Sequence, residues 1–187
     1  PAGSTAVRGA HAHPERIELS IKQLGDFTST IGDVKRGETA WFDAPYGRFG
    51  IDECPDAAGY VFVAGGIGIA PIMSMLRTLA DRGDRRPLQL FYGNRVWDRV
   101  AFREELEALR ERLSLDIVHV LIEPLADWTG ERGFVTHEVL QRHLAPHAPR
   151  LEYFICGPTP MTQSVERNLA ALGVDSARVH SEIFDWV

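Results

Sequence analysis

The chain has 187 residues, of which 44% are hydrophobic and 25% are charged, as in an ordinary globular protein. Its formal net charge of −6 and the lack of a basic stripe argue against a nucleic-acid-binding protein. No run reaches the roughly 18–20 apolar residues of a membrane span, and the N-terminal residues lack the pattern of a signal peptide. We therefore expect no membrane contact within this chain and a cytoplasmic location, or the cytoplasmic face of a membrane if the parent protein carries spanning helices.

The first third of the chain predicts two strands around one short helix. Residues 17–22 alternate apolar and polar side chains, which is the period of a half-buried strand. A short segment with the sequence GDFTSTIGDV follows at 25–34, a second strand is expected around 39–42, and residues 44–50 are rich in turn formers. So few strands do not make a stable domain. We therefore expect residues 1–55 to be part of a larger unit.

From residue 59 onward, apolar strands alternate with amphipathic helices. Strands are expected at 60–64, 88–92, 115–122, 152–156 and 178–183. The helices between them are expected at 71–82, around 102–109, at 135–144 and at 161–172. This order predicts an α/β fold with a five-stranded, doubly wound parallel sheet and right-handed crossovers.

The sharpest local signal is the glycine-rich turn between the first strand and the first helix, VAGGIGIAP at 63–71. Gly65, Gly66 and Gly68 allow unusual backbone angles and a close approach to a phosphate. The following helix directs free N–H groups at such an anion, and Pro71 suits its first turn. The alternative is a tight turn that binds no ligand.

Two further strand ends carry candidate binding residues. After the second strand, in YGNR at 92–95, Asn94 can donate hydrogen bonds and Arg95 can pair with a ribose or a 2′-phosphate. The alternative is a solvated turn, and NADH or NADPH is left undecided.

The fourth strand ends in CGPTPM at 156–161. Here Cys156, Gly157 and Pro158 predict a pocket wall that approaches a flat ring without hydrogen bonds to it. The alternative is that Cys156 is simply buried and that Met161 fills the core.

Neither cysteine nor histidine spacing predicts a metal site. Cys54 and Cys156 form no CxxC motif, which argues against a disulfide framework and suits a reducing compartment. His11 and His13 have no third ligand nearby in the sequence. His143 and His147 are separated by Pro146, which should end a helix, so we predict no metal ligands.

The three strand-end motifs, in this order and spacing, resemble the NAD(P)-binding domain of the ferredoxin–NADP reductase superfamily. The match extends over residues 17–187. GDFT at 25–28 resembles the flavin-phosphate turn of that superfamily, APYGRF at 44–49 the stretch that closes its flavin barrel, and HSEIF at 180–184 its terminal strand. Within the superfamily, these stretches are most similar to ferric reductases, NADPH oxidase relatives and reductase components.

The resemblance implies two domains and a set of residue roles. Residues 1–55 would be a partial, antiparallel FAD-binding β-barrel, and residues 56–187 the NAD(P)-binding domain. The glycine turn with Pro71 would hold the pyrophosphate and the nicotinamide side, and Arg95 the adenosine side. Cys156 would flank the reacting nicotinamide carbon, while Glu182 and Phe184 would line the flavin. The flavin phosphate would be held by Gly25, Thr28, Ser29 and Thr30, although Thr28 alone also suits a helix cap.

The function implied by the resemblance is transfer of hydride from NAD(P)H to FAD. Electrons would then pass to a haem, an iron–sulfur protein or ferric iron, in an acceptor protein or in a haem-bearing membrane domain. Cys156 and Glu182 are the residues expected at the reacting atoms. The Arg-x-Tyr/Phe-Ser flavin motif of an earlier barrel strand has no match here, so we expect a truncated barrel with weak or no FAD binding.

Two other functions remain open from the sequence. One is a nucleotide-binding module that binds NAD(P) without catalysis of its own. The other is a flavin-free NAD-dependent dehydrogenase, against which the GDFT stretch argues.

Overall fold

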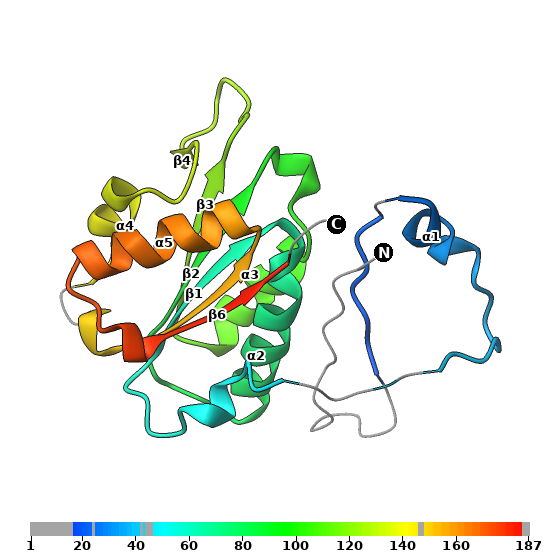
Figure 1. Cartoon of the computed structure of the whole chain (residues 1–187), viewed down its shortest axis with the longest axis horizontal. Coiled ribbons are helices and arrows are strands. Elements are labelled where there is room, and N and C mark those ends of the chain that lie inside the picture. Colours follow the sequence, from blue (N-terminus) through cyan, green and yellow to red (C-terminus); the bar gives the residue numbers. More distant parts are fainter. Residues whose placement is uncertain (1–16, 24, 42, 44–46, 146–147, 185–187) are drawn as a thin grey trace.

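The centre of the molecule is a six-stranded sheet in which all pairs of neighbours are parallel (Figure 1). The computed structural model describes residues 17–23, 25–41, 43, 47–145 and 148–184. The strand order is β4-β3-β2-β1-β5-β6. The strands are β1 Tyr60–Gly65, β2 Leu88–Asn94, β3 Leu115–Leu121, β4 Glu131–Arg132, β5 Glu152–Gly157 and β6 Val179–Ile183.

The predicted parallel α/β sheet is confirmed, but the predicted count of five strands is wrong. Each expected strand is present within a few residues of its predicted range. The sixth strand, β4, has two residues and pairs only with Val120 and Leu121 of β3. Two residues are too short to carry a periodic pattern, so sequence periodicity does not reveal this strand.

Helices cover both faces of the sheet. One face packs against α2 (Ile69–Asp81) and α3 (Arg103–Arg112), and the other against α4 (His137–His143) and α5 (Thr159–Ala171). Alternate residues of β1 face opposite sides: Phe62 joins the α2 and α3 cluster, and Val61 and Val63 join the α4 and α5 cluster. All six residues of β1 are therefore buried, which explains its continuous apolar sequence.

The remaining helices are short. The N-terminal segment contains α1 (Gly25–Ser29), the short helix that the sequence predicts there. Six 3-10 turns complete the described structure: η1 Ile31–Asp33, η2 Ile51–Glu53, η3 Gly66–Gly68, η4 Trp97–Arg99, η5 Ala148–Arg150 and η6 Ser176–Arg178. Among the described residues, no helix has both the length and the apolar composition needed to cross a membrane.

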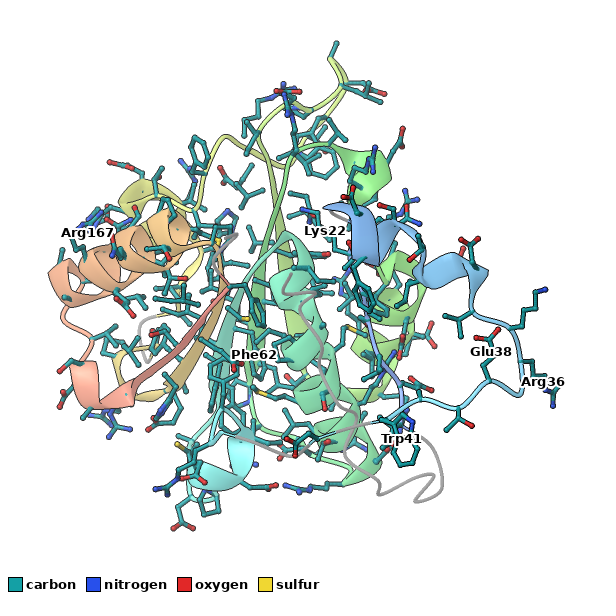
Figure 2. All side chains as sticks on the ribbon, turned by 45° about the vertical axis from the view of Figure 1, so that its right-hand side comes forward. Lys22, Arg36, Glu38, Trp41, Phe62 and Arg167 are labelled. Atoms are coloured by element: carbon teal, nitrogen blue, oxygen red, sulfur yellow. The ribbon has the colours of Figure 1, made fainter. Side chains whose placement is uncertain are left out.

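The two strands predicted before residue 55 are absent from the described part of that segment. Residues 17–22 and 39–41 form no ladder with any described residue. An alternating pattern gives an extended chain one apolar side, but a strand also needs a neighbour for its hydrogen bonds. Apolar side chains remain exposed here instead: Phe27 is 66% exposed and Trp41 is 93% exposed. Figure 2 shows Trp41 on this segment. The expected barrel is thus not confirmed.

Ion pairs and aromatic contacts attach the N-terminal segment to the sheet domain. Arg77 of α2 binds Glu105 of α3 and also reaches Glu18, with 3.3 Å between Nη1 and Oε2. Phe49 packs edge-on against Phe154 of β5, with ring centroids 5.5 Å apart. Residues near 49–54 therefore pack against the core of the sheet.

Candidate functional site

The strand order places a topological switch point between β1 and β5. The connection from β1 to β2 runs through α2 on one face, whereas the connection from β5 to β6 runs through α5 on the other. In open α/β sheets, ligands bind where neighbouring strands diverge in this way. The glycine turn and the Cys156 motif lie at the carboxyl ends of β1 and β5, so the structure brings these two predicted motifs together.

The turn after β1 has the features of an anion-binding loop. Gly65 ends β1, Gly66 has a φ of +55°, and a Cβ at Gly66 would meet no atom within 4 Å. Helix α2 begins at Ile69, two residues earlier than predicted, and no side chain caps its N-terminus. Pro71 lies in the first turn, as expected. The N–H of Ile69 already donates to the carbonyls of Gly66 and Ile67 in the 3-10 turn η3, so the open space at this turn lies beside Gly66, next to the positive end of the α2 dipole.

The other two glycines of the turn are close to the end of β5 and the start of α5, and Gly68 is required because the backbone of β5 approaches it. A Cβ at Gly68 would overlap the carbonyl group of Cys156, and one at Gly65 would lie 2.5 Å from Sδ of Met161. A Cβ at Gly157 would lie 3.2 Å from the backbone of Gly65. The turn after β1 and the end of β5 are therefore in backbone contact.

Cys156 forms a fully buried part of this region. It is 0% exposed and aligns with Ala64 of β1 on one side and Glu182 of β6 on the other. Burial, and to a lesser degree the charge of Glu182, raises the pKa of the Cys156 thiol well above its usual range, so the thiol stays protonated. A neutral, buried thiol is a wall of the site rather than a nucleophile.

Glu182 and Phe184 complete the edge formed by β5 and β6. The backbone N–H of Phe184 donates to the carbonyl of Gly157 at 3.1 Å, which fixes the residue next to the predicted nicotinamide wall. Partial burial raises the pKa of the Glu182 carboxyl, although the residue remains exposed to solvent. The carboxyl therefore holds a proton at higher pH than an ordinary glutamate does.

Pro158 and Met161 support the same wall from the start of α5. Both are half-buried, and the Met161 side chain lies under Gly65 and Gly157. Pro158 is the N-cap residue of α5 and offers no side-chain hydrogen bond.

Asn94 and Arg95 lie at the carboxyl end of β2, on the other side of the glycine turn. Asn94 is 8% exposed, and its Nδ2 has no hydrogen-bond partner among the described residues. A buried amide without a partner costs stability unless a ligand satisfies it. Tyr92 is fully buried beside it and donates to the carbonyl of Gly66 at 3.4 Å, and burial raises its pKa to about 12.

The structure adds a partner for Arg95 that sequence reasoning missed. Nε and Nη2 of Arg95 donate to Oε1 of Glu123 at 3.0 and 2.8 Å, and both side chains are largely exposed. The two residues are 28 positions apart but follow the neighbouring strands β2 and β3. From the sequence, this pair could be anticipated only by expecting the strands that precede Arg95 and Glu123 to be neighbours in the sheet.

The predicted flavin-phosphate residues lie in α1 and, for Thr30, just after it, apart from the strand ends (Figure 1). Thr28 is buried, Gly25 has a φ of +71°, and the Thr30 hydroxyl donates to the carbonyl of Phe27 at 2.8 Å. The Ser29 hydroxyl likewise donates to the carbonyl of Gly25. Both hydroxyls are thus directed at their own backbone.

Comparison with known proteins gives concordant matches. Residues 62–167 match the family model described as the oxidoreductase NAD-binding domain. NADH-cytochrome b5 reductase 1 of Candida glabrata is 30% identical over 178 residues, which are 91% of this chain and 62% of that protein. The glycine betaine monooxygenase reductase subunit of Pseudomonas aeruginosa is 29% identical over 97% of this chain and 50% of its own length.

A solved structure shows the same fold. The ferredoxin NADP+ reductase from Neisseria gonorrhoeae with bound FAD and NADP superposes with a TM-score of 0.76 at 21% identity, covering 98% of this chain and 79% of that one. The chain spans less than two thirds of the length of the curated relatives described above. Because the family model covers more than half of the chain, the protein belongs to the oxidoreductase NAD-binding domain family.

Proposed function

We propose that this chain binds NAD(P)H at the glycine turn and delivers its hydride to FAD as part of a flavin-dependent oxidoreductase. The observation that carries the proposal is the glycine turn between β1 and α2, which has open space beside Gly66 and lies in backbone contact with the end of β5. Hydride transfer is the chemistry that the two cofactors supply when bound. The residues of the chain position the cofactors and control charge and water around them.

The pyrophosphate is assigned to the turn of Gly65, Gly66 and Gly68, with Pro71 in the helix that follows. Gly66 has a φ of +55° and open space beside it, and the positive end of the α2 dipole lies next to this turn, so a phosphate would be favoured there. Asn94 fits the adenosine side, because a ligand acceptor would satisfy its buried Nδ2. Arg95 would reach the ribose after exchange of its contact with Glu123.

The nicotinamide is assigned to the wall formed by Cys156, Gly157, Pro158 and Met161. A protonated thiol and a glycine present no charge and little bulk to a flat ring. Glu182 and Phe184 border that wall, so the flavin is assigned to their side. With its raised pKa, the Glu182 carboxyl suits a group that holds a proton at Oε near the reacting atoms.

We assign the flavin phosphate to the start of α1. The hydroxyls of Ser29 and Thr30 donate to backbone carbonyls, and the Thr30 N–H donates to the carbonyl of Phe27, so the backbone N–H groups at the start of α1, residues 25–28, are the donors assigned to it. On this basis residues 1–55 belong to the flavin domain and residues 56–187 form the nucleotide domain.

For the electron acceptor, we propose a chemical class and not a particular protein. The relatives are named as reductases of cytochrome b5 or as the reductase subunit of a monooxygenase. We propose a haem or iron–sulfur protein as the acceptor, with the domain on the cytoplasmic side of any membrane that carries the partner.

A second candidate is a module that binds NAD(P)H but relies on another polypeptide for flavin. The absence of strands from described residues 17–41 and the exposure of Phe27 and Trp41 favour it. Exposed aromatic side chains of this size suit packing against further flavin-domain surface.

One spectroscopic experiment separates the two candidates. The chain is mixed with FAD under anaerobic conditions, passed over a desalting column, and then titrated with NADH or NADPH. Retained flavin whose absorbance is bleached by nucleotide supports the reductase. Nucleotide binding without retained flavin supports the module, and failure to bind either nucleotide contradicts both.

Variants test the two ends of the nucleotide site. Replacing Asn94 with Leu removes the buried donor at similar volume, and we expect weaker nucleotide binding; unchanged affinity would contradict the role of Nδ2. Replacing Glu182 with Gln should alter the pH dependence of flavin reduction. The matched control is Glu166→Gln on α5, since Glu166 accepts a hydrogen bond from the hydroxyl of Ser181, the β6 residue next to Glu182.

A further inference from the structure

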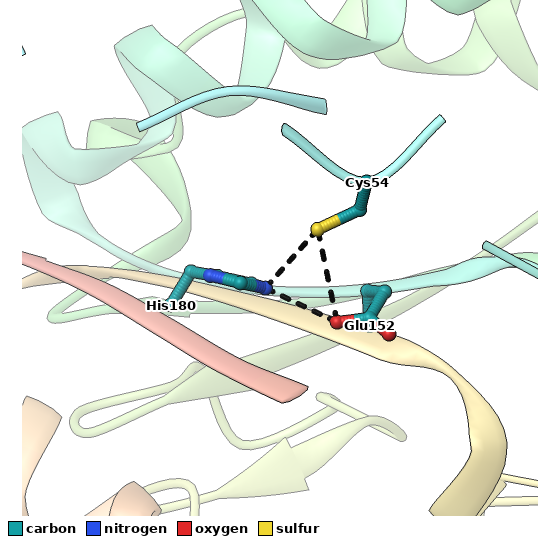
Figure 3. Close-up of side chains that lie close together, drawn as sticks. All are labelled: Cys54, Glu152 and His180. Carbon is teal, nitrogen blue, oxygen red and sulfur yellow. Dashed lines mark hydrogen bonds and ion pairs between the residues drawn. The ribbon is translucent and has the colours of Figure 1, made fainter. Parts of the chain in front are cut away.

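A second cluster of reactive side chains lies at the opposite end of β5 from the nucleotide site. Cys54, Glu152 and His180 come from the loop after η2, the first residue of β5 and the second residue of β6 (Figure 3). Gly157 lies five positions after Glu152 along β5, a distance of about 16 Å at the usual rise of a strand. The cluster is therefore separate from the proposed hydride-transfer site.

The three side chains converge on one point. Sγ of Cys54 lies 3.3 Å from Nε2 of His180 and 3.8 Å from Oε2 of Glu152, and that nitrogen and oxygen are 3.1 Å apart. We propose that these three atoms bind one Zn²⁺ ion, with a water molecule as the fourth ligand. This metal site does not depend on the proposed nucleotide binding.

The distances fit tetrahedral coordination. Zinc bonds of about 2.3 Å to sulfur, 2.05 Å to nitrogen and 2.1 Å to oxygen place tetrahedral ligand atoms about 3.4–3.6 Å from one another. The three measured separations bracket this range, so each side chain needs to move by only a few tenths of an ångström. One thiolate, one imidazole and one carboxylate is also a ligand set that suits zinc.

The arrangement does not suit a nucleophilic triad. In such a triad the acid binds the histidine nitrogen that is remote from the nucleophile. Here both Sγ of Cys54 and Oε2 of Glu152 lie against Nε2 of His180. Burial and the charge of Glu152 also raise the pKa of the Cys54 thiol, which opposes a free thiolate. A cation at the shared point would replace the thiol proton and join the three donors.

Neighbouring residues hold the donors in place. Nη1 of Arg178 donates to Oε1 of Glu152 at 2.6 Å, which leaves Oε2 directed at the cluster. The His180 ring stacks on Phe154 with centroids 4.8 Å apart, and the Tyr60 hydroxyl donates to the carbonyl of Cys54 at 3.0 Å. Outer contacts of this kind orient the ligands of metal sites.

A bound ion would attach the loop before β1 to two strands of the sheet. Residues 51–54 connect the N-terminal segment to β1, and Ile51 of this loop is already buried in the core. Glu152 and His180 lie 98 and 126 residues after Cys54 in the chain, so only the folded chain brings the three ligands together. Metal binding therefore stabilises the folded state over the unfolded one.

The test uses the full chain, stripped of metal with a chelator and titrated with Co²⁺ and then Zn²⁺. We expect one equivalent of Co²⁺ to give intense tetrahedral d–d bands and a thiolate charge-transfer band, all removed by one equivalent of Zn²⁺. We also expect Zn²⁺ to raise the melting temperature. No stoichiometric binding of either ion would overturn the proposal.

Variants assign the ligands. Cys54→Ser, with its fold verified by circular dichroism, should lose the charge-transfer band. It should also bind Zn²⁺ at least about tenfold more weakly, since removing even an outer contact of a metal site lowers the metal affinity about 10–100-fold. His180→Gln should act similarly and serves if Cys54→Ser does not fold. The matched control is His143→Gln, because His143 forms a histidine–glutamate pair with Glu131 at 2.7 Å that contains no sulfur. Unchanged affinity and charge-transfer band in Cys54→Ser would refute the site.

Discussion

Replacement of Gly68 by alanine tests whether the turn after β1 and the end of β5 are in backbone contact. Gly68 has φ −58° and ψ −9°, so alanine fits its backbone angles. The obstacle is steric, because the added Cβ would overlap the carbonyl group of Cys156 and lie 3.0 Å from the amide nitrogen of Gly157. Backbone atoms of a central strand cannot rotate away as a flexible side chain does, so β1 and β5 must separate locally.

The expected cost follows from two opposing terms. Overpacking in a well-packed core costs about 1–3 kcal/mol. Replacing a glycine by alanine at compatible backbone angles stabilises the folded state by about 0.4–1 kcal/mol, because it lowers the conformational entropy of the unfolded chain. The net loss of unfolding free energy is then about 1–2 kcal/mol, which lowers the melting temperature by roughly 2–8 °C for a chain of this size.

Urea unfolding and nucleotide titration together make the experiment decisive. The matched variant is Gly66→Ala, whose Cβ meets no protein atom but sits at a φ of +55°. We expect Gly66→Ala to lose about 1 kcal/mol through backbone strain and to weaken nucleotide binding, because the methyl group occupies the open space. A Gly68→Ala variant as stable as the parent chain would refute the steric argument.

Three further outcomes follow from the described contacts. Burial lowers the pKa of His119, so the unfolded chain binds a proton at this residue more readily than the folded chain does. The free energy of unfolding should therefore fall as the pH drops below about 6.5, by at most about 1.4 kcal/mol per pH unit. His119→Phe should remove that loss in urea titrations, and an unchanged pH dependence would exclude His119 as its source. Glu123→Gln removes the ion pair of Arg95 and should raise the affinity for NADPH severalfold relative to NADH at low salt. The control Glu107→Gln on α3 should leave this preference unchanged. If Glu123→Gln also leaves it unchanged, Arg95 does not contact the 2′-phosphate. In the metal-free folded chain, a thiol reagent should modify one cysteine only, because Cys156 is fully buried, and rapid modification of both would contradict that burial.

The sheet was predictable because each main strand carries its own signal. The β1 sequence is apolar throughout, as expected of a strand with helices on both faces. The glycine turn and the Cys156 motif were each predicted at the carboxyl end of a strand, and they meet because parallel strands place those ends at one edge of the sheet. The two-residue β4 and the paired Arg95 and Glu123 follow instead from strand adjacency, which local patterns do not encode.

The N-terminal segment and the Cys54 cluster show the limits of local patterns. Alternation at 17–22 describes one apolar side, yet a strand also requires a partner, and none of the described residues supplies it. Cys54, Glu152 and His180 are far apart in sequence, and no spacing motif links them. Their proximity follows only from the packing of the η2 loop on β5 and β6.

The position of β1 at the centre of the sheet has a consequence for synthesis of the chain. One edge of β1 pairs with β2, which ends at Asn94, but the other edge waits for β5, which ends at Gly157. The ribosome adds the 63 intervening residues (157 − 94) in roughly 3–13 s at about 5–20 residues per second. During that interval a nascent chain presents the unpaired edge of its most apolar strand, which is a template for pairing with another chain. Chaperone contact with the nascent chain is therefore expected to peak before β5 emerges and to decline once it has docked.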